Sequence, residues 1–229
     1  MMKEQLESIQ HTIKKAAEKS GRKEEDITLI AVSKTYPASA IQEAIALGCK
    51  DFGENKVQEL VQKIESIEEP VNWHMIGHLQ TNKVKYIIGK TALVHSVDSL
   101  KLLKEIQKQS LKKDVITSIL LEVNVAQEDS KSGILLEEAM DYASSISKLS
   151  HVRCEGLMTV APYVENPEDN RLVFRQLYDL SVDMQKQKFD NINMHVLSMG
   201  MSNDYWVAIE EGATMVRIGT ALFGARNYT

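Results

Sequence analysis

Lys34 is the residue in this chain whose position most suggests chemistry. It follows Ile30–Ser33, a mostly apolar run with the β-branched residues of a buried strand, so its amine emerges where that strand ends. Desolvation at such a place disfavours the charged ammonium form, and a neutral lysine amine can attack a carbonyl carbon to form a Schiff base. A lysine at a strand end can also simply extend to water. Position alone leaves both interpretations open.

Two segments near the C-terminus have the composition of phosphate-binding loops. They are 198–202, which contains Gly200, and the pair Gly219-Thr220. Glycine lets backbone N–H groups approach an anion, while Ser202 and Thr220 would supply hydroxyls at helix N-termini. Turn formation or helix capping explains either segment alone. The two segments together favour an anion site.

Arg217 stands in an otherwise apolar strand between Val216 and Ile218. A buried guanidinium needs acceptors for its fork of donors. The sequence offers two kinds of partner, the ring nitrogen of a cofactor or a carboxylate such as Glu210 in a structural ion pair.

The histidines carry less information. His74 and His78 have the i, i+4 spacing of a metal pair on a helix, but His74 lies in an expected strand and no acidic third ligand follows at a useful distance. We therefore predict no metal site. His95 is interpreted as a hydrogen-bonded core histidine.

The elements that would position these residues alternate along the chain. Runs rich in β-branched residues predict strands, and amphipathic runs of period 3.6 predict helices between them. The expected strands are 28–33, 51–53, 73–76, 93–96, 116–125, 152–160, 194–197 and 214–218. The expected helices are 38–47 with Gly48 as its stop, a segment with Val57, Leu60, Val61 and Ile64 on one face, then 82–88, 99–109, 135–147, 168–187 and 202–211, and one extra helix at the N-terminus.

Strict alternation of strand and helix means parallel strands joined by crossovers, and eight such units close into a (β/α)₈ TIM barrel. We therefore expect an α/β protein in which residues 1–229 form a single barrel domain. An open doubly wound sheet is the alternative. No glycine-rich dinucleotide fingerprint follows any expected strand, which weighs against it.

Functional groups in a TIM barrel gather at the carboxyl ends of the strands, and the loops after strands seven and eight commonly hold phosphate. The residues expected at those ends are Lys34, Glu54, Asn55, Gly77, His78, Asn124, Met158, Thr159, 198–202 and 217–220. The two glycine-containing segments thus fall where a barrel would use them.

Composition limits the classes of function. The net charge of −5 argues against a general nucleic-acid binder, which must neutralise phosphates. Cys49 and Cys154 are too few for a disulfide framework and are expected to be buried reduced thiols. No stretch has the apolar length of a signal sequence or a membrane span. We expect a cytoplasmic protein.

From about residue 3 to residue 226 the chain resembles the pyridoxal-phosphate homeostasis proteins (the YggS-like family), and six ordered blocks carry the resemblance. The blocks are Ala31–Thr35, Phe52–Glu59, Trp73–Lys83, Gly156–Thr159, Leu197–Ser202 and Val216–Thr220. The resemblance implies the barrel of the alanine racemase N-terminal domain, the fold of type III pyridoxal-phosphate proteins. It also implies that Lys34 holds pyridoxal 5′-phosphate as a Schiff base.

Other residue roles follow from the same resemblance. The phosphate would bind Ser198, Met199, Ser202, Gly219 and Thr220, Arg217 would face the pyridine nitrogen, and Asn55 would lie beside the ring. An arginine there disfavours protonation of the ring nitrogen and weakens the ring as an electron sink.

A racemase also needs a second proton-transfer group, which alanine racemase takes from a partner subunit and a C-terminal β domain. This chain ends at Thr229. We therefore expect a monomeric carrier without catalytic residues, which buffers the cofactor and supplies it to pyridoxal-phosphate-dependent apoenzymes. A small pyridoxal-phosphate-dependent amino-acid racemase remains the alternative. A cofactor-free lysine aldolase fits the barrel but not the family blocks.

Overall fold

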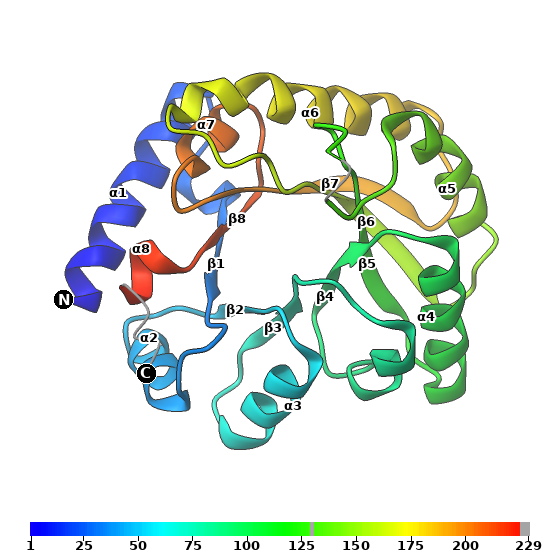
Figure 1. The fold of residues 1–229 in the computed structure, drawn as a ribbon, viewed down its shortest axis with the longest axis horizontal. Coiled ribbons are helices and arrows are strands. Elements are labelled where there is room, and N and C mark those ends of the chain that lie inside the picture. Colours follow the sequence, from blue (N-terminus) through cyan, green and yellow to red (C-terminus); the bar gives the residue numbers. More distant parts are fainter. Residues whose placement is uncertain (129–130, 225–229) are drawn as a thin grey trace.

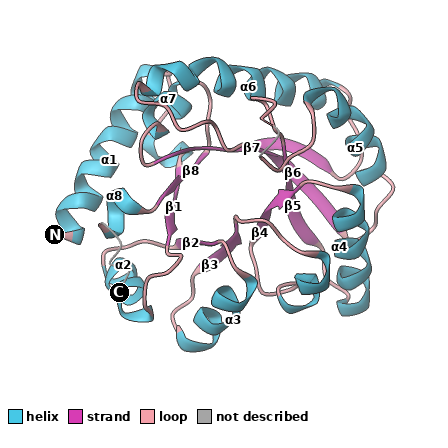
Figure 2. Ribbon diagram, viewed as in Figure 1, coloured by secondary structure: helices cyan, strands magenta, loops and turns pink. Residues whose placement is uncertain are grey.

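Eight parallel strands hydrogen-bond in chain order in the described part of the chain and close into a barrel (Figure 1, Figure 2). This computed structural model describes residues 1–128 and 131–224, so the last five residues of the predicted span 1–229 lie outside it. The predicted TIM barrel is confirmed. The strands are β1 (Thr28–Val32), β2 (Asp51–Glu54), β3 (Asn72–Met75), β4 (Leu93–Val97), β5 (Thr117–Glu122), β6 (Val152–Met158), β7 (Ile192–Met201) and β8 (Met215–Ile218).

Helices form an outer ring around the strands, as the view down the barrel in Figure 1 shows. They are α1 (Met2–Lys19), α2 (Ala38–Ala46), α3 (Val57–Ser66), α4 (Leu100–Lys113), α5 (Ala139–Ile146), α6 (Arg171–Lys186), α7 (Tyr205–Glu210) and α8 (Thr220–Phe223). The extra N-terminal helix is α1, which packs against α7 and α8. Gly48 follows α2 with a φ of +97°, as its predicted role as a helix stop requires. Among the described helices, none is long and apolar enough to cross a bilayer.

Several boundaries differ from those predicted, and one difference affects the candidate site. β7 continues to Met201 instead of ending at Leu197, so Ser198 and Met199 are strand residues. α7 begins at Tyr205, which leaves Ser202 in the preceding turn and not at a helix N-terminus. The predicted helix 82–88 is a 3₁₀ helix, Thr81–Tyr86. Glycine and hydroxyl residues suggested an early turn, but hydrogen bonding to the neighbouring strands extends β7.

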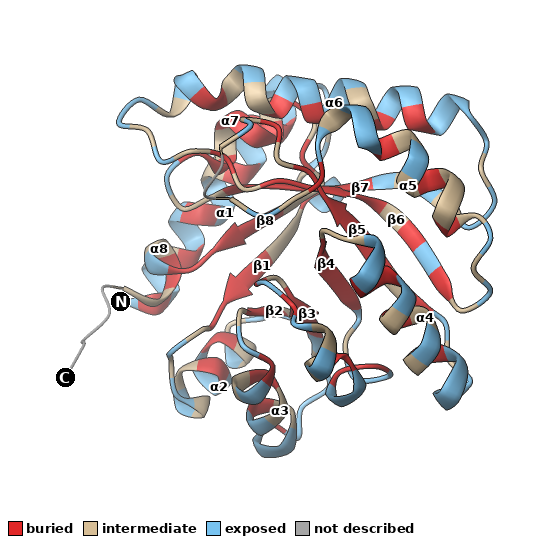
Figure 3. Cartoon of the chain, turned by 45° about the vertical axis from the view of Figure 1, so that its right-hand side comes forward, coloured by how far each residue is buried: buried red, intermediate tan, exposed pale blue. Residues whose placement is uncertain are grey.

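Alternation along the strands separates two environments. On β8, Val216 and Ile218 point into the apolar layer between barrel and helices, while Arg217 points to the barrel interior. A smaller apolar cluster, which includes Leu93 and Leu120, fills part of the interior. Figure 3 shows buried residues along the strands and exposed residues on the outer faces of the helices. Polar groups at other interior positions build the site described below.

Gly156 is where β6 and β7 approach most closely among the glycines of these strands. A Cβ at this position would lie 1.8 Å from the carbonyl oxygen of Val196, and the φ of Gly156 is +154°. The pairing of β6 with β7 is irregular just before it, between Cys154 and Gly156. Only glycine fits this contact without moving one of the two strands.

Replacing Gly156 with alanine should therefore lower the free energy of unfolding by about 3 kcal/mol or more, because the methyl group must displace backbone. Gly21→Ala is the matched control. Gly21 also has positive φ, +73°, but a Cβ added to it would meet no atom within 4 Å. That change should cost only about 1 kcal/mol. Urea unfolding of both variants checks the prediction, and equal losses would contradict it.

Candidate functional site at the carboxyl end of the barrel

The predicted site residues gather at one end of the barrel. Lys34 follows β1 by two residues and is half-buried. In the sheet, Ile30 of β1 pairs with Arg217 of β8. Lys34 follows Ile30 by four residues and so lies nearer the carboxyl end of the barrel than Arg217 does. Closure of the barrel places this end of β1 between the ends of β8 and β2. We call this end the mouth.

The backbone on the carboxyl side of Lys34 is held in an uncommon conformation. Thr35 has a φ of +69°, a left-handed value that costs a residue with a β-branched side chain about 1 kcal/mol or more. The backbone N–H of Thr35 donates to the Glu59 carboxylate on α3. Tyr36, next in the chain, donates its hydroxyl to the carbonyl of Gly224 at 2.7 Å and stacks on Phe223. The turn that carries Lys34 is therefore tied to both α3 and the segment after β8.

The backbone on the amino side of Lys34 is held by a buried ion-pair cluster. The Lys63 amine on α3 donates to the Ser33 carbonyl at 2.7 Å, to Glu54 Oε1 at 2.6 Å and to Glu59 Oε1 at 2.9 Å. The Ser33 hydroxyl also donates to Glu54 Oε1, at 2.6 Å. Burial raises the pKa of Glu54, against the opposing effect of Lys63 and Ser33. Both neighbours of Lys34 are thus clamped by the same cluster.

Arg217 is buried and bonds to neutral oxygens. Its Nη1 donates to the carbonyl and the hydroxyl oxygen of Ser198, at 2.7 and 2.6 Å, and its Nη2 donates to the Thr159 carbonyl at 2.8 Å. Burial lowers the pKa of Arg217 to about 10, which still leaves it cationic at neutral pH, and the Glu122 and Asp204 carboxylates oppose that shift. The alternative prediction, an ion pair between Arg217 and Glu210, is wrong, because Glu210 pairs with Lys19 and Arg171 at 2.8 Å each.

Of the predicted phosphate residues, Ser202 lies against the segment that contains Gly219 and Thr220. The Ser202 hydroxyl accepts a hydrogen bond from the Ala221 N–H at 3.4 Å, which joins the turn after β7 to the start of α8. Thr220 is exposed beside it and Gly219 is buried. Met199 directs its side chain into the outer apolar layer, so it offers the mouth only backbone groups. Their role in holding phosphate remains a prediction.

The Ser198 hydroxyl lies deeper than the sequence suggested. Its Oγ is 2.9 Å from His95 Nδ1 in addition to its bond with Arg217. His95 in turn contacts His74, so the expectation that His95 is a hydrogen-bonded core histidine is confirmed.

Asn55 follows β2 and is half-buried at the mouth. Its place depends on Gly77, because a Cβ on Gly77 would lie 2.6 Å from both the Cα and the carbonyl oxygen of Asn55. The backbone after β3 can therefore lie directly against Asn55 and support it.

Glu122 is a group at the mouth that sequence reasoning missed. It ends β5, is buried, and faces the positive charge of Arg217. Burial raises its pKa to about 7, and Asp98 adds to the rise, while Arg217 and His78 act in the opposite sense. Asp98 itself contacts His78 Nδ1 at 3.2 Å. Glu122 is two residues after Leu120 and therefore shares its face of the strand, which points to the barrel interior; this spacing was the signal that could have found it.

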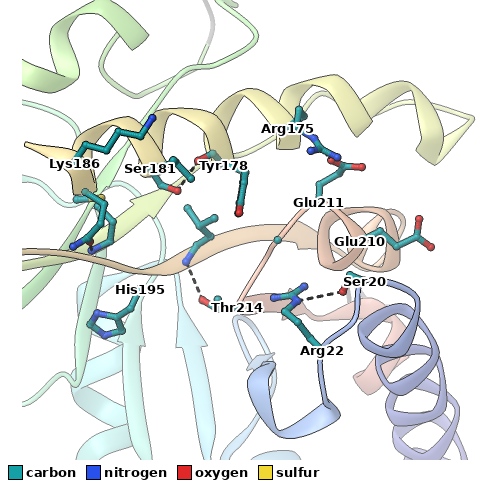
Figure 4. A pocket seen from close by; sticks show the side chains of 15 residues that line it. Ser20, Arg22, Arg175, Tyr178, Ser181, Lys186, His195, Glu210, Glu211 and Thr214 are labelled. Carbon is teal, nitrogen blue, oxygen red and sulfur yellow. Dashed lines mark hydrogen bonds and ion pairs between the residues drawn. The ribbon is translucent and has the colours of Figure 1, made fainter.

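A cavity of about 620 Å³ lies away from the mouth, near the amino-terminal ends of β7 and β8 (Figure 4). Its charged side chains are paired within the protein. Arg175 contacts Glu211 at 2.5 Å, and Arg22 donates to the Ala213 carbonyl at 2.8 Å. We therefore place the site at the mouth, where polar groups converge, and not in this larger cavity.

Cys49 and Cys154 are buried free thiols, as predicted, and burial raises their pKa values to about 11 and about 12. Within residues 1–128 and 131–224, no group of three or more His, Cys, Asp or Glu side chains could hold a metal ion.

Comparison with known proteins identifies the family. Residues 5–227 match the family described as alanine racemase, N-terminal domain. A pyridoxal phosphate homeostasis protein of Aquifex aeolicus is 46% identical over 226 residues, which cover 98% of each chain. The chain belongs to the pyridoxal phosphate homeostasis protein family. Another member, from Escherichia coli, is 39% identical over 98% of this chain and 96% of its own length.

Solved structures agree with this membership. PipY of Synechococcus elongatus with pyridoxal phosphate bound is 31% identical, with a TM-score of 0.85, and covers 98% of this chain and 100% of its own. An alanine racemase of Clostridium difficile is 16% identical, with a TM-score of 0.72, and this chain covers 55% of its length. The second likeness shows the fold alone. The family shares its barrel with an enzyme of a different overall length.

Removing Lys63 should destabilise the protein because it leaves the Glu54 carboxylate buried without its cation. We expect Lys63→Met to lower the free energy of unfolding by about 3–5 kcal/mol at pH 8. Substituting both partners, Lys63→Met with Glu54→Gln, should recover most of that loss. Urea unfolding checks this. A double variant no more stable than Lys63→Met would show that the pair is not coupled as described.

Glu122 should make stability depend on pH. Its ordinary pKa is 4.5 and its folded value is about 7, so the folded protein binds more protons between these values. The unfolding free energy should therefore fall as pH rises from 4.5 to 7, by roughly 3 kcal/mol at most, and stay lowered above pH 7. Glu122→Gln should abolish this component. The unfolding free energy of the variant minus that of wild type should thus be larger at pH 8 than at pH 5. A difference that does not change with pH would refute the prediction.

Proposed function

We propose that this protein binds pyridoxal 5′-phosphate as a Schiff base on Lys34 and serves as a reversible store of the cofactor. The observation that carries the proposal is the convergence, at one barrel mouth, of a clamped lysine, a buried guanidinium and two joined loops of glycine and hydroxyl residues. The names of the relatives and the pyridoxal phosphate in PipY agree with it.

The residues at the mouth suit the three functional parts of this cofactor. Pyridoxal phosphate supplies an aldehyde, which a neutral lysine amine captures with loss of one water molecule, and water reverses the reaction. Lys34 supplies the amine. We assign the phosphate to Ser198, Met199, Ser202, Gly219 and Thr220, because backbone and hydroxyl groups are the usual partners of phosphate in barrels. Ser202 and Thr220 offer hydroxyls, whereas Ser198, whose hydroxyl contacts Arg217 and His95, offers only backbone groups.

Arg217 is the residue that we assign to the pyridine nitrogen, with Asn55 beside the ring. The three bonds from Arg217 to Ser198 and Thr159 go to neutral oxygens and use three of its five N–H groups. Within the described residues, no ion pair joins Arg217 to a carboxylate. A buried cation of this kind disfavours a proton on a neighbouring ring nitrogen, because two positive charges would meet.

The role that follows is that of a carrier and not of a catalyst. A ring nitrogen kept unprotonated is a poor electron sink, and proton abstraction from an amino acid depends on that sink. We place this role in the cytoplasm, where reduced thiols such as Cys49 and Cys154 are the ordinary state. In this proposal the protein acts as a monomer, limits free reactive aldehyde and supplies the cofactor to apoenzymes.

The absorbance spectrum tests the proposal directly. Wild type mixed with pyridoxal phosphate should develop a visible band that borohydride removes by fixing the cofactor covalently, and Lys34→Ala should show neither effect. A mass spectrum of the reduced protein should place the added mass on Lys34. Absence of the band in wild type would end the proposal.

Amino-acid turnover separates carrier from enzyme. Loaded wild type incubated with alanine and other amino acids should racemise or transaminate no faster than Lys34→Ala under the same conditions. Steady turnover above that control would contradict the carrier role while leaving cofactor binding in place.

A further inference from the structure

A continuous chain of hydrogen bonds crosses the barrel interior through five strands. Arg217 Nη1 on β8 lies 2.6 Å from Ser198 Oγ on β7, and Ser198 Oγ lies 2.9 Å from His95 Nδ1 on β4. His95 Nε2 is 3.0 Å from His74 Nδ1 on β3, and His74 Nε2 is 3.0 Å from Asp51 Oδ1 on β2. We call these five residues the interior chain.

The interior chain forms a floor beneath the mouth. Its two ends lie at one level of the barrel, because Ile30 of β1 pairs with Asp51 on one side and with Arg217 on the other. Lys34 lies four residues beyond Ile30, above this level. Ser198, His95 and His74 are each at most 3% exposed, so protein neighbours and not solvent set the hydrogen positions in the middle of the chain.

The chemistry of the two ends fixes the direction of the first and the last bond of the chain. A guanidinium only donates, so Ser198 Oγ accepts from Arg217. An ionised carboxylate only accepts, so His74 must carry a proton on Nε2 to donate to Asp51. Asn72 also donates to the same Asp51 oxygen, at 3.0 Å, which confirms its role as an acceptor.

The middle of the chain then has a single arrangement for neutral histidines. Burial, with the nearby His74 and Arg217, lowers the pKa of His95 well below its ordinary value. A neutral His74 with its proton on Nε2 has a bare Nδ1, so His95 must donate from Nε2 to it. His95 Nδ1 is then bare and accepts the Ser198 hydroxyl hydrogen. Each donor points away from Arg217 and towards Asp51.

We propose that His95 and His74 are positioning residues for the ring-nitrogen end of the cofactor site, an inference that rests on the proposed function. They commit the Ser198 hydroxyl hydrogen to the barrel interior, so that Ser198 faces Arg217 only as an acceptor. The carbonyls of Ser198 and Thr159 complete the hold on Arg217. The guanidinium is thereby kept in one orientation with its charge towards the ring nitrogen.

The first experiment needs no cofactor. Nitrogen-15 and proton NMR of the ligand-free protein, with histidine labelled, reports the protonation of each ring nitrogen at pH 7.5. His95 and His74 should both be neutral with hydrogen on Nε2, and Ser198→Ala should shift the His95 Nδ1 resonance. A hydrogen on Nδ1 of either ring, or a doubly protonated ring, would overturn the inference.

The second experiment compares two ligands on matched variants. His95→Leu removes both bonds of the ring, whereas His95→Gln keeps an acceptor and a donor at similar separation. His95→Leu should weaken binding of pyridoxal phosphate on the order of tenfold, while His95→Gln should stay within about threefold of wild type. The 1-deaza analogue, in which C–H replaces the ring nitrogen, should bind His95→Leu within about twofold of wild type.

The outcomes separate this inference from the proposed function. If wild type binds no pyridoxal phosphate, the proposed function fails, and the NMR result still decides the direction of the chain. If His95→Leu weakens both ligands equally, the ring acts through general packing and the inference fails. If His95→Leu does not fold, the same comparison is made with His74→Leu and His74→Gln, one bond further from Arg217. His74→Leu should then weaken binding of pyridoxal phosphate more than binding of the 1-deaza analogue.

Discussion

The burial of a cation inside the closed barrel is the constraint on which the polar interior depends. Taking Arg217 out of water costs free energy that must be offset by close acceptors. The protein provides Ser198 and Thr159 oxygens at 2.6 to 2.8 Å, and carboxylates at a greater distance that act through their charge. Because a guanidinium can only donate, the hydroxyl oxygen of Ser198 is an acceptor for Arg217. A cluster of apolar residues fills another part of the interior.

A second buried charge, on Lys63, shapes the outer side of the same mouth. Its three bonds hold α3 against the end of β1 and β2, and through Ser33 and Glu59 they restrain the backbone on both sides of Lys34. Positive φ at Thr35 persists because this cluster and the contact of Tyr36 with Gly224 over-determine the turn. The two cations thus act at different places. Lys63 restrains the backbone that carries Lys34, and Arg217 lies in the barrel interior.

The shared barrel of this family and alanine racemase illustrates how little a fold says about chemistry. At 16% identity the two have the same barrel fold, yet function depends on the groups at the mouth. Here a buried arginine hydrogen-bonded to neutral oxygens occupies the position beneath the lysine. In the proposed function, this buried charge disfavours a proton on the ring nitrogen of the cofactor.

The sequence by itself determined the barrel, because eight alternations of strand and helix have few other solutions. It also singled out Lys34 and Arg217 as candidates, because a charged residue in or directly after an apolar strand is conspicuous. It also placed Gly48 correctly, since a helix stop is a local property. It could not determine that β7 extends to Met201, which depends on pairing with β6 and β8. Nor could it predict the hydrogen bonds that connect Asp51, His74, His95 and Ser198, because bonded neighbours in this chain are up to 103 residues apart in the sequence. Lys63 and Glu122 look like ordinary helix and strand-end charges in the sequence. Their surroundings exist only once the barrel closes, because burial and hydrogen-bond partners are properties of the tertiary structure.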